Sequence, residues 1–380
     1  MKPKNEKQPK TWRKVKLGEV LELKYGFGLP ETKRKTGRVP VFGSSGIVGA
    51  HNEAAVQSQG IVIGRKGHVG SIHYSNVPFY PIDTVYYVDQ LKIPGDIKFF
   101  YYFLKRMPFQ QIGSDVGVPG LNRDIAYSLE VKIPEDPNIQ KRIADVLSAF
   151  DDKIELNNKI NQTLEQMAQA IFKEWFVSPS IALAEEDKLP KGWRVGKLGE
   201  LMVARKEKFR KYEEWKNLKL LDLGRFPQKS LAITSYGKGE EIKTAGIGFK
   251  KGDVLFGAVR PYFHKVVIAP FDGVTNSSVF VITPKKESSY AFLVTVLFSE
   301  NTVNYASMSA SGTKMPVIKW EDLCDMEVLI PEERAIENFN KTVKNFYNLI
   351  IKNTLENQKL ASLRDLLLPK LMSGEILVKS

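Results

Sequence analysis

Two long stretches of the chain repeat their apolar residues at alternating steps of four and three, the spacing typical of coiled-coil helices. Between Pro137 and Val177 there is no glycine and no further proline. The first seam consists of Ile143, Leu147, Phe150, Ile154, Asn157, Asn161, Leu164, Ala168, Ile171 and Trp175, and the second of Phe339, Val343, Phe346, Ile350, Asn353, Asn357, Leu360, Arg364, Leu367 and Leu371. Each stretch predicts a helix of roughly 35 to 40 residues, about 55 Å long.

Each seam contains two asparagines at matching interior places. An antiparallel pairing of the helices would set Asn157 against Asn357 and Asn161 against Asn353 in one polar layer. Buried asparagines cost stability but select one register, which makes such a layer a plausible specificity device. Alternatively, the asparagines lie on a solvated face while Leu156 and Ile160 pack.

Arg364 interrupts the second seam. Leu363, its neighbour, is the residue that we expect in the core at this level of the helix pair.

The rest of the chain consists of short apolar or alternating runs between Gly, Pro and Asn, which predict strands. The clearest strands are 60–63, 84–88, 253–256 and 278–282, and helices are predicted at 97–107 and 289–298. The predicted fold class is therefore α+β, with two strand-rich domains in tandem and two long antiparallel coiled-coil helices.

A sequence repeat sets the domain boundaries. Trp12-Arg13 and Lys16-Leu17-Gly18-Glu19 return as Trp193-Arg194 and Lys197-Leu198-Gly199-Glu200, and Glu130-Val131 with Ile133-Pro134-Glu135 returns as Glu327-Val328 with Ile330-Pro331-Glu332. We therefore predict a pseudo-two-fold chain with a first module at 1–135, a long helix at 136–178, a linker at 179–192, a second module at 193–331 and a second long helix at 332–380.

Charge is concentrated in the modules. The chain carries a net charge of +13; residues 1–135 hold 20 basic and 12 acidic residues (+8), and residues 193–331 hold 21 and 15 (+6). Basic charge in two repeated modules favours two contacts with a polyanion such as nucleic acid. No apolar run is long enough to span a membrane, the start resembles no signal peptide, and Cys324 is the only cysteine, so we expect a cytoplasmic protein with no membrane partner.

The loops after two matching strands, 64–70 and 257–265, differ from each other and supply candidate DNA contacts, and other polar loops that precede or follow predicted strands supply further ones. Glycines admit a close backbone, and arginine can bind a guanine edge or a phosphate. The candidates are Ser44, Ser45, Arg65, Lys66, Gly67, His68, Asn122 and Arg123 in the first module, and Arg260, Tyr262, His264, Lys265, Thr313 and Lys314 in the second.

No constellation for catalysis or metal binding stands out in the sequence. The four histidines lack metal-site spacing except for His68 and His73, five residues apart, a spacing that more often is coincidence. No Walker loop and no Asn- or Asp-Pro-Pro-aromatic methyltransferase motif is present. Acid-x-Lys triplets at Glu22-Leu23-Lys24 and Glu130-Val131-Lys132 are expected by chance in a chain so rich in Lys and Glu. We expect no catalytic residue, no bound metal and no cofactor in this chain.

The repeated Trp-x-x-x-x-Leu-Gly-Glu and Ile-Pro motifs, the stretch Asp151–Asn161 and the tail Leu363–Ile376 together resemble the specificity subunit of type I restriction-modification enzymes over nearly the whole chain. The resemblance implies that each module is a target recognition domain that binds half of a split double-stranded DNA sequence. It implies that the helices form a spacer that docks two modification subunits, which bring S-adenosylmethionine and methylate adenine. Restriction subunits would add translocation and cleavage with ATP and Mg2+.

Two other functions remain open at this point. The chain could be a basic scaffold that binds RNA or acidic proteins, or a fused restriction enzyme with its own catalytic site.

Overall fold

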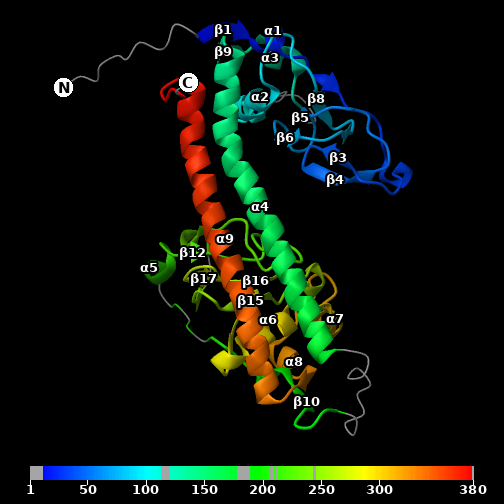
Figure 1. Cartoon of the computed structure of the whole chain (residues 1–380), viewed down its shortest axis with the longest axis vertical. Coiled ribbons are helices and arrows are strands. Elements are labelled where there is room, and N and C mark those ends of the chain that lie inside the picture. Colours follow the sequence, from blue (N-terminus) through cyan, green and yellow to red (C-terminus); the bar gives the residue numbers. More distant parts are fainter. Residues whose placement is uncertain are drawn as a thin grey trace, which may run out of the picture. The chain divides into compact units, whose positions relative to one another are not determined.

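The computed structural model describes residues 12–112, 120–177, 189–205, 207, 209, 212–242 and 245–378. The chain divides into two compact units (Figure 1). Unit 1 contains residues up to Asp151 and from Ser362 onward, and unit 2 contains Asp152–Ala361. Unit 1 thus includes the first module, and unit 2 includes the second.

Unit 1 is built on an antiparallel four-stranded sheet in the order β2-β8-β5-β6, beside a three-stranded sheet in the order β4-β3-β7. The strands are β1 (Trp12–Lys16), β2 (Lys24–Tyr25), β3 (Val39–Gly43), β4 (Gly46–His51), β5 (Gly60–Gly64), β6 (Ile72–Ser75), β7 (Tyr80–Pro81), β8 (Val85–Val88) and β9 (Glu130–Pro134). The helices are α1 (Leu17–Val20), α2 (Ile97–Leu104) and α3 (Arg123–Ser128). The apolar face of α2, with Phe99, Phe100 and Phe103, packs against the sheet residues Ile61 and Ile63 to form the core.

Unit 2 repeats this arrangement with sheets in the orders β11-β18-β15-β16 and β13-β12-β17-β14. Its strands are β10 (Arg194–Lys197), β11 (Met202–Ala204), β12 (Lys219–Leu220), β13 (Gly237–Lys238), β14 (Ile247–Phe249), β15 (Val254–Gly257), β16 (Val266–Ile268), β17 (Gly273–Thr275), β18 (Val279–Pro284) and β19 (Glu327–Ile330). Its shorter helices are α5 (Tyr212–Trp215), α6 (Tyr290–Leu297), α7 (Glu300–Ser309) and α8 (Trp320–Cys324). The mixed helix and strand content agrees with the predicted α+β class.

The repeated sequence motifs are strand partners that close each module. In unit 1, β1 pairs antiparallel with β9, and in unit 2, β10 pairs antiparallel with β19. The glutamate side chain of each Leu-Gly-Glu accepts a hydrogen bond from the backbone N–H of the last residue of the preceding strand. The distance is 3.3 Å from Lys16 to Glu19 and 2.8 Å from Lys197 to Glu200. The motif thus connects the strand to a tight helical turn in both modules.

The glycine of this motif allows a helix to approach closely. A β-carbon at Gly18 would lie 2.8 Å from the Tyr127 β-carbon of α3, and one at Gly199 would lie 2.9 Å from the Cys324 β-carbon of α8. Real side chains do not tolerate such contacts, so the repeated glycine is explained by packing.

The long helices are α4 (Pro137–Phe176) and α9 (Glu333–Ser373). Proline suits the first turn of α4 because its missing N–H would have no partner there. Gly374, with φ of +75°, follows the end of α9 in the left-handed conformation that commonly terminates helices. Each helix belongs partly to both units: Ile143 and Leu147 of α4 pack in the unit 1 core, whereas Leu164 and Ala168 pack in that of unit 2.

The helices pair antiparallel within unit 2 through the asparagines. The Asn157 side-chain amide donates to Asn357 Oδ1 at 2.9 Å, and that of Asn353 donates to Asn161 Oδ1 at 2.8 Å. These are the partners that the antiparallel register requires. The alternative with solvated asparagines is wrong, because Asn157 and Asn161 are buried and Leu156 is 51% exposed; of the two residues that it placed in the core, Ile160 packs there.

Replacing Asn353 with leucine should lower the free energy of unfolding by about 1–3 kcal/mol, because the buried Asn161 would lose its partner. The Asn161→Leu, Asn353→Leu double variant should recover most of this loss, since it removes both polar groups. Urea denaturation of the three variants measures the effect. A double variant less stable than either single one would contradict this account of the layer.

In unit 1, Arg364 occupies a seam position of α9 and forms an ion pair there. Its guanidinium contacts Asp151 of α4, and Asp151 also accepts a hydrogen bond from the Tyr102 hydroxyl at 2.6 Å. The expectation that Leu363 replaces it in the core is wrong, because Leu363 is 48% exposed. A charged partner across the helix pair makes arginine acceptable at an apolar position.

Candidate nucleic-acid interface

In the first module, the β3–β4 turn and the β5–β6 loop form one polar surface. Ser44 lies in the turn, where its hydroxyl accepts a hydrogen bond from the His68 backbone N–H at 3.4 Å and its carbonyl accepts one from the Ser71 hydroxyl. The side chains of Ser45 and His68 are exposed, and Gly67 adopts a φ of +76°. Ser44 therefore fixes the two loops together, which leaves Ser45 and His68 available to a ligand.

The segment that leads into α3 joins this surface. The Leu121 N–H donates to the Arg65 carbonyl at 3.0 Å, and Lys66 forms a β-bridge with Gly120. Asn122 caps α3, since its Oδ1 accepts from the backbone N–H groups of Asp124 and Ile125. The predicted contact Asn122 thus has a structural role, whereas Arg65, Lys66 and Arg123 are brought together.

In the second module, the loop after β15 is held in an unusual conformation. Arg260 and His264 have φ near +50° and flank a short 3-10 turn at Pro261–Phe263. The Arg260 backbone N–H donates to the Pro316 carbonyl at 2.8 Å, and its guanidinium donates to the Lys314 carbonyl at 3.2 Å. Arg260 therefore supports the hairpin that exposes Thr313 and Lys314, and Tyr262 is also exposed.

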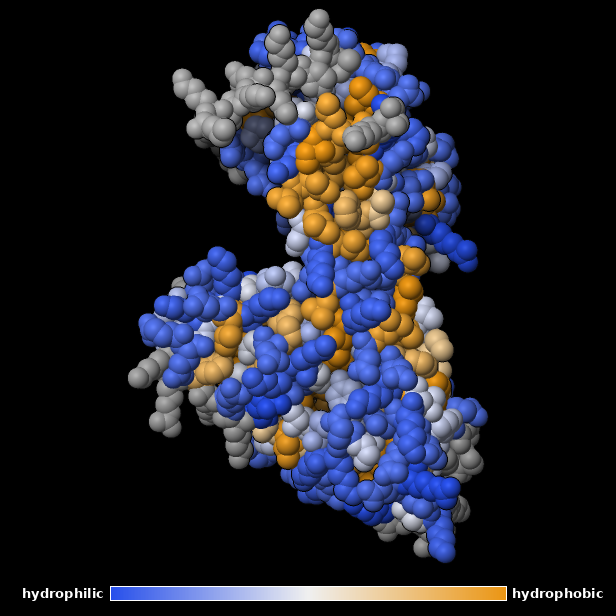
Figure 2. Space-filling view, turned by 60° about the vertical axis from the view of Figure 1, so that its left-hand side comes forward, coloured by the Kyte–Doolittle hydropathy of each residue, from blue (hydrophilic) through white to orange (hydrophobic). Residues whose placement is uncertain are grey.

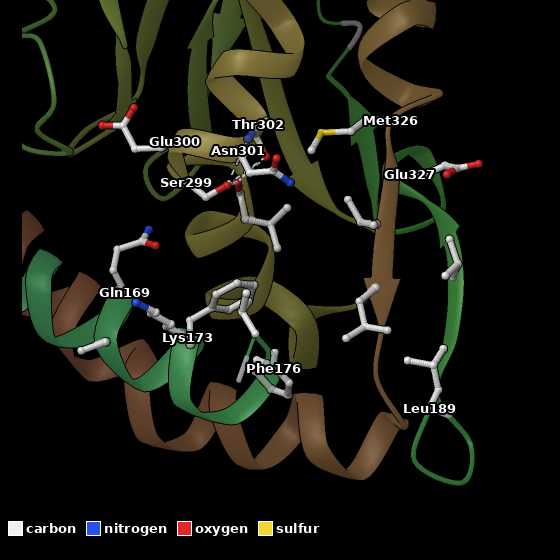
Figure 3. Close-up of a pocket in the computed structure, with 17 residues that line it drawn as sticks. Gln169, Lys173, Phe176, Leu189, Ser299, Glu300, Asn301, Thr302, Met326 and Glu327 are labelled. Atoms are coloured by element: carbon white, nitrogen blue, oxygen red, sulfur yellow. Dashed lines mark hydrogen bonds between the residues drawn. The ribbon is translucent and has the colours of Figure 1, made fainter. Parts of the chain in front are cut away.

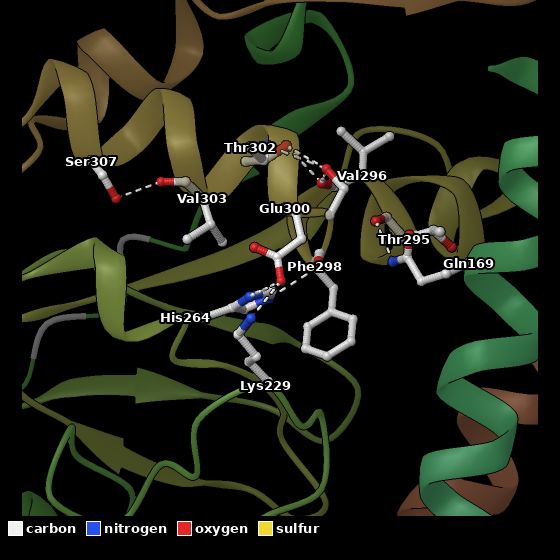
Figure 4. A network of polar contacts seen from close by, with 11 residues as sticks. Gln169, Lys229, His264, Thr295, Val296, Phe298, Glu300, Thr302, Val303 and Ser307 are labelled. Atoms are coloured by element: carbon white, nitrogen blue, oxygen red, sulfur yellow. Dashed lines mark hydrogen bonds and ion pairs between the residues drawn. The ribbon is translucent and has the colours of Figure 1, made fainter. Parts of the chain in front are cut away.

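His264 is an internal anchor of this loop rather than an exposed contact. Its side chain is buried, with 4% exposure, its Nε2 lies 3.0 Å from the Phe298 carbonyl oxygen, and its Nδ1 lies 3.6 Å from Glu300 (Figure 4). Burial lowers the pKa of His264. Lys229 completes the network with a 2.8 Å ion pair to Glu300. Lys265 is also engaged, because its ammonium donates to the Leu223 carbonyl.

Sequence reasoning missed a basic loop before β3. Lys33, Lys35 and Arg38 are exposed, while the Arg34 guanidinium donates to the Val48 carbonyl of β4 at 2.8 Å. The loop is thereby fixed to the hairpin that carries Ser44 and Ser45. Four basic residues within positions 33–38 were a visible signal, and they add positive charge beside the candidate contacts.

The second module is attached to α4 through a buried carboxylate. Glu165 Oε1 accepts hydrogen bonds from the Leu231 N–H at 2.7 Å and the Ser230 hydroxyl at 3.0 Å. Burial raises the pKa of Glu165 to about 7, although the two hydrogen bonds oppose the shift. The folded protein therefore holds a proton here that the unfolded chain releases near pH 4.5.

Stability should accordingly fall as the pH rises from about 4.5 to about 7, by about 2–3 kcal/mol from this group. Glu165→Gln keeps an oxygen for the Leu231 N–H but does not titrate, so it should remove this part of the pH dependence and be more stable than the native protein at pH 8. Urea midpoints from pH 4.5 to 8 test this. A difference between variant and native protein that does not change with pH would refute it.

A cavity of about 910 Å3 lies at the end of α4 in unit 2. Gln169, Lys173 and Phe176 of α4 face it, together with the segment 299–302 at the start of α7 and Met326 and Glu327 at the start of β19 (Figure 3). Its lining is mainly apolar. Among the described residues, no group of three or more His, Cys, Asp or Glu side chains could hold a metal ion.

The C-terminal part of α9 exposes apolar side chains at Leu363 and Leu366, and Leu377 follows the helix. Figure 2 shows hydrophobic residues gathered on a face of unit 1. Exposed apolar surface of this kind is typical of protein interaction sites. No helix in the described part of the chain has the length and apolar character needed to cross a membrane.

Comparison with known proteins identifies the family. The sequence model of one protein family, the type I restriction modification DNA specificity domain, matches residues 9–166 and 190–364, once for each module. The chain is 27% identical to the type I restriction enzyme MjaIX specificity subunit of Methanocaldococcus jannaschii, over 98% of this chain and 95% of that protein. It is 26% identical to the HindI specificity subunit of Haemophilus influenzae, over 68% and 71%.

A solved structure has the same fold. The S subunit of a type I restriction-modification system from M. genitalium superimposes with a TM-score of 0.63 at 18% identity, covering 95% of this chain and 96% of that one. Two matched domains in tandem, each closed by the same strand pair, account for the sequence repeat. The chain belongs to the family of type I restriction-modification specificity subunits.

Proposed function

We propose that the chain is the DNA-recognition subunit of a type I restriction-modification complex, and that each module binds one half of a bipartite double-stranded target. The observation that carries the proposal is that both modules place polar and basic groups around the loop after the equivalent strand of their four-stranded sheets. Lys66 and His68 are exposed after β5, and Tyr262 is exposed after β15, where Arg260 supports the hairpin that exposes Lys314. The loops differ in sequence and conformation, so the two half-sites should differ. Basic loops supply phosphate contacts and base-edge donors together.

The chain acts in this proposal without a catalytic group of its own. Two modification subunits would bring S-adenosylmethionine and methylate adenine, and restriction subunits would use ATP and Mg2+. The apolar surface on α9 near Leu363 and Leu366 supports docking of such a protein partner. The complex would act on DNA in the cytoplasm.

The long helices would set the separation of the half-sites. Helices of 40 and 41 residues are about 60 Å long, and each contributes one end to unit 1 and the other to unit 2. The asparagine layer fixes their register. About 18 base pairs of duplex have a similar length.

Co-expression with the neighbouring modification subunit, followed by mapping of methylated adenines on genomic DNA, tests the proposal. We expect methylation within two short fixed sequences separated by a gap of constant length and variable sequence. Expression of the modification subunit alone is the control and should leave this pattern absent. Methylation that does not depend on this chain, or that follows one uninterrupted sequence, would refute the proposal.

A further inference from the structure

Two arginines of the first module lie against one exposed tyrosine. The Arg65 and Arg123 guanidinium carbons are each 5.2 Å from the centroid of the Tyr25 ring. Arg65 is also 5.8 Å from the Tyr86 ring, and Arg123 is 5.9 Å from the Tyr127 ring. Tyr25 remains 50% exposed, so this Arg-Tyr-Arg cluster opens to solvent.

Both arginines are fixed before any ligand arrives. The Arg65 guanidinium donates to the Asp83 carbonyl at 2.6 Å, and the Arg65 N–H donates to the Thr84 carbonyl at 2.9 Å. Arg123 is the first residue of α3, directly after the capping residue Asn122. Tyr25 is itself positioned by strand pairing, because β2 pairs with β8 and sets the Tyr25 and Tyr86 rings 5.0 Å apart.

The cluster has positive charge without a matching carboxylate. Within the described part of the chain, neither guanidinium forms an ion pair, and the Nε atoms of both arginines are buried without a hydrogen-bond partner. Contact with an aromatic face contributes only about 0.5–1 kcal/mol for each cation at an exposed site. Two like charges beside one ring repel each other, and a bound anion would relieve this repulsion.

We infer that Arg65 and Arg123, held by Tyr25, bind a single backbone phosphate of the DNA duplex. A phosphodiester offers one negative charge and two free oxygens, so it can accept from both guanidinium groups. A guanine edge has acceptors for one arginine only. The contact therefore positions the first module on DNA independently of sequence, and Tyr25 is a positioning residue.

Among the described residues of the second module, aromatic residues stand where the first module has Tyr86 and Arg123. Gly64 pairs with Val85 and Gly257 pairs with Val279, so Phe280 of β18 occupies the place of Tyr86 in β8. Phe280 contacts Trp320, the first residue of α8, at 5.4 Å between ring centroids. An aromatic pair thus replaces Tyr86 and Arg123, and Trp320→Phe provides a matched control.

The inference rests on the proposed function, and binding of the assembled complex to its mapped target and to a scrambled duplex of equal length tests it. Arg65→Gln and Arg123→Gln should each weaken binding to both duplexes by the same factor, on the order of tenfold, and reduce the slope of log affinity against log salt by about 0.9. The double variant should lose little more of this slope, because both arginines share one phosphate. Tyr25→Phe should bind as the native complex does, Tyr25→Ala should resemble the arginine variants, and Trp320→Phe should leave the salt slope unchanged.

Loss of binding confined to the mapped target would show a base contact and overturn the inference, as would arginine variants with native affinity and slope. Slopes that fall separately for each arginine would show two phosphates and overturn the shared site. If the native complex binds neither duplex, the proposed function itself fails and the inference falls with it. The arginine variants decide the question even if Tyr25→Ala fails to fold.

Discussion

Replacing Phe339 with alanine is expected to lower the free energy of unfolding of unit 2 by about 3–5 kcal/mol. The side chain is fully buried near the start of α9. Its ring lies 5.3 Å from that of Phe176 and 6.0 Å from that of Phe172, both of α4, and 6.4 Å from that of Phe292 in α6. The substitution would leave a cavity where both long helices meet the second module.

Leu349→Ala is the matched control, because Leu349 lies on the same helix and is partly exposed. It should lower the free energy of unfolding by about 1 kcal/mol or less. Urea denaturation followed by tryptophan fluorescence compares the two variants. Equal losses would mean that this aromatic cluster is not the main attachment of the helices to the module.

The long helices and the principal strands were predictable from the sequence because their periodicity is strong. The predicted helix 136–178 corresponds to α4, and the predicted strands 60–63 and 253–256 correspond to β5 and β15 within one residue at each end. The predicted range of the second long helix, 332–380, was too long at its C-terminal end, since α9 ends at Ser373. Gly374 was the signal for that end.

The partners of particular side chains were not predictable. Arg364 breaks an apolar pattern, and its role depends on Asp151 and Tyr102, whose proximity only the fold establishes. The pairing of β1 with β9 was likewise hidden, although both strands carry repeated motifs. Local patterns specify elements, whereas contacts between distant segments depend on how those elements pack.

The sequence predicted the loops of the candidate interface more reliably than the individual residues that a ligand could contact. Arg65, Lys66 and Arg123 lie together on one surface, but His264 is buried and Asn122 caps a helix. Histidine and asparagine suit both structural and binding roles, so residue type alone could not separate these. Tyr25 was overlooked because an isolated tyrosine in a strand gives no signal until the two arginines are placed beside it.

Shortening both long helices by one heptad is expected to shorten the gap between the recognised half-sites. Removing residues 154–160 together with 354–360 keeps the antiparallel register, because it deletes Asn157 with its partner Asn357 and retains Asn161 with Asn353. Seven residues correspond to about 10 Å of helix, or about 3 base pairs. Removing residues 154–160 alone is the control; it should abolish assembly, since the helices would then be out of register.

Mapping methylated adenines with the doubly shortened chain therefore tests most directly whether the helix pair sets the distance between two DNA contacts. The expected result is methylation within the same two half-site sequences with a gap about 3 base pairs shorter. Methylation that retains the original gap would contradict the account.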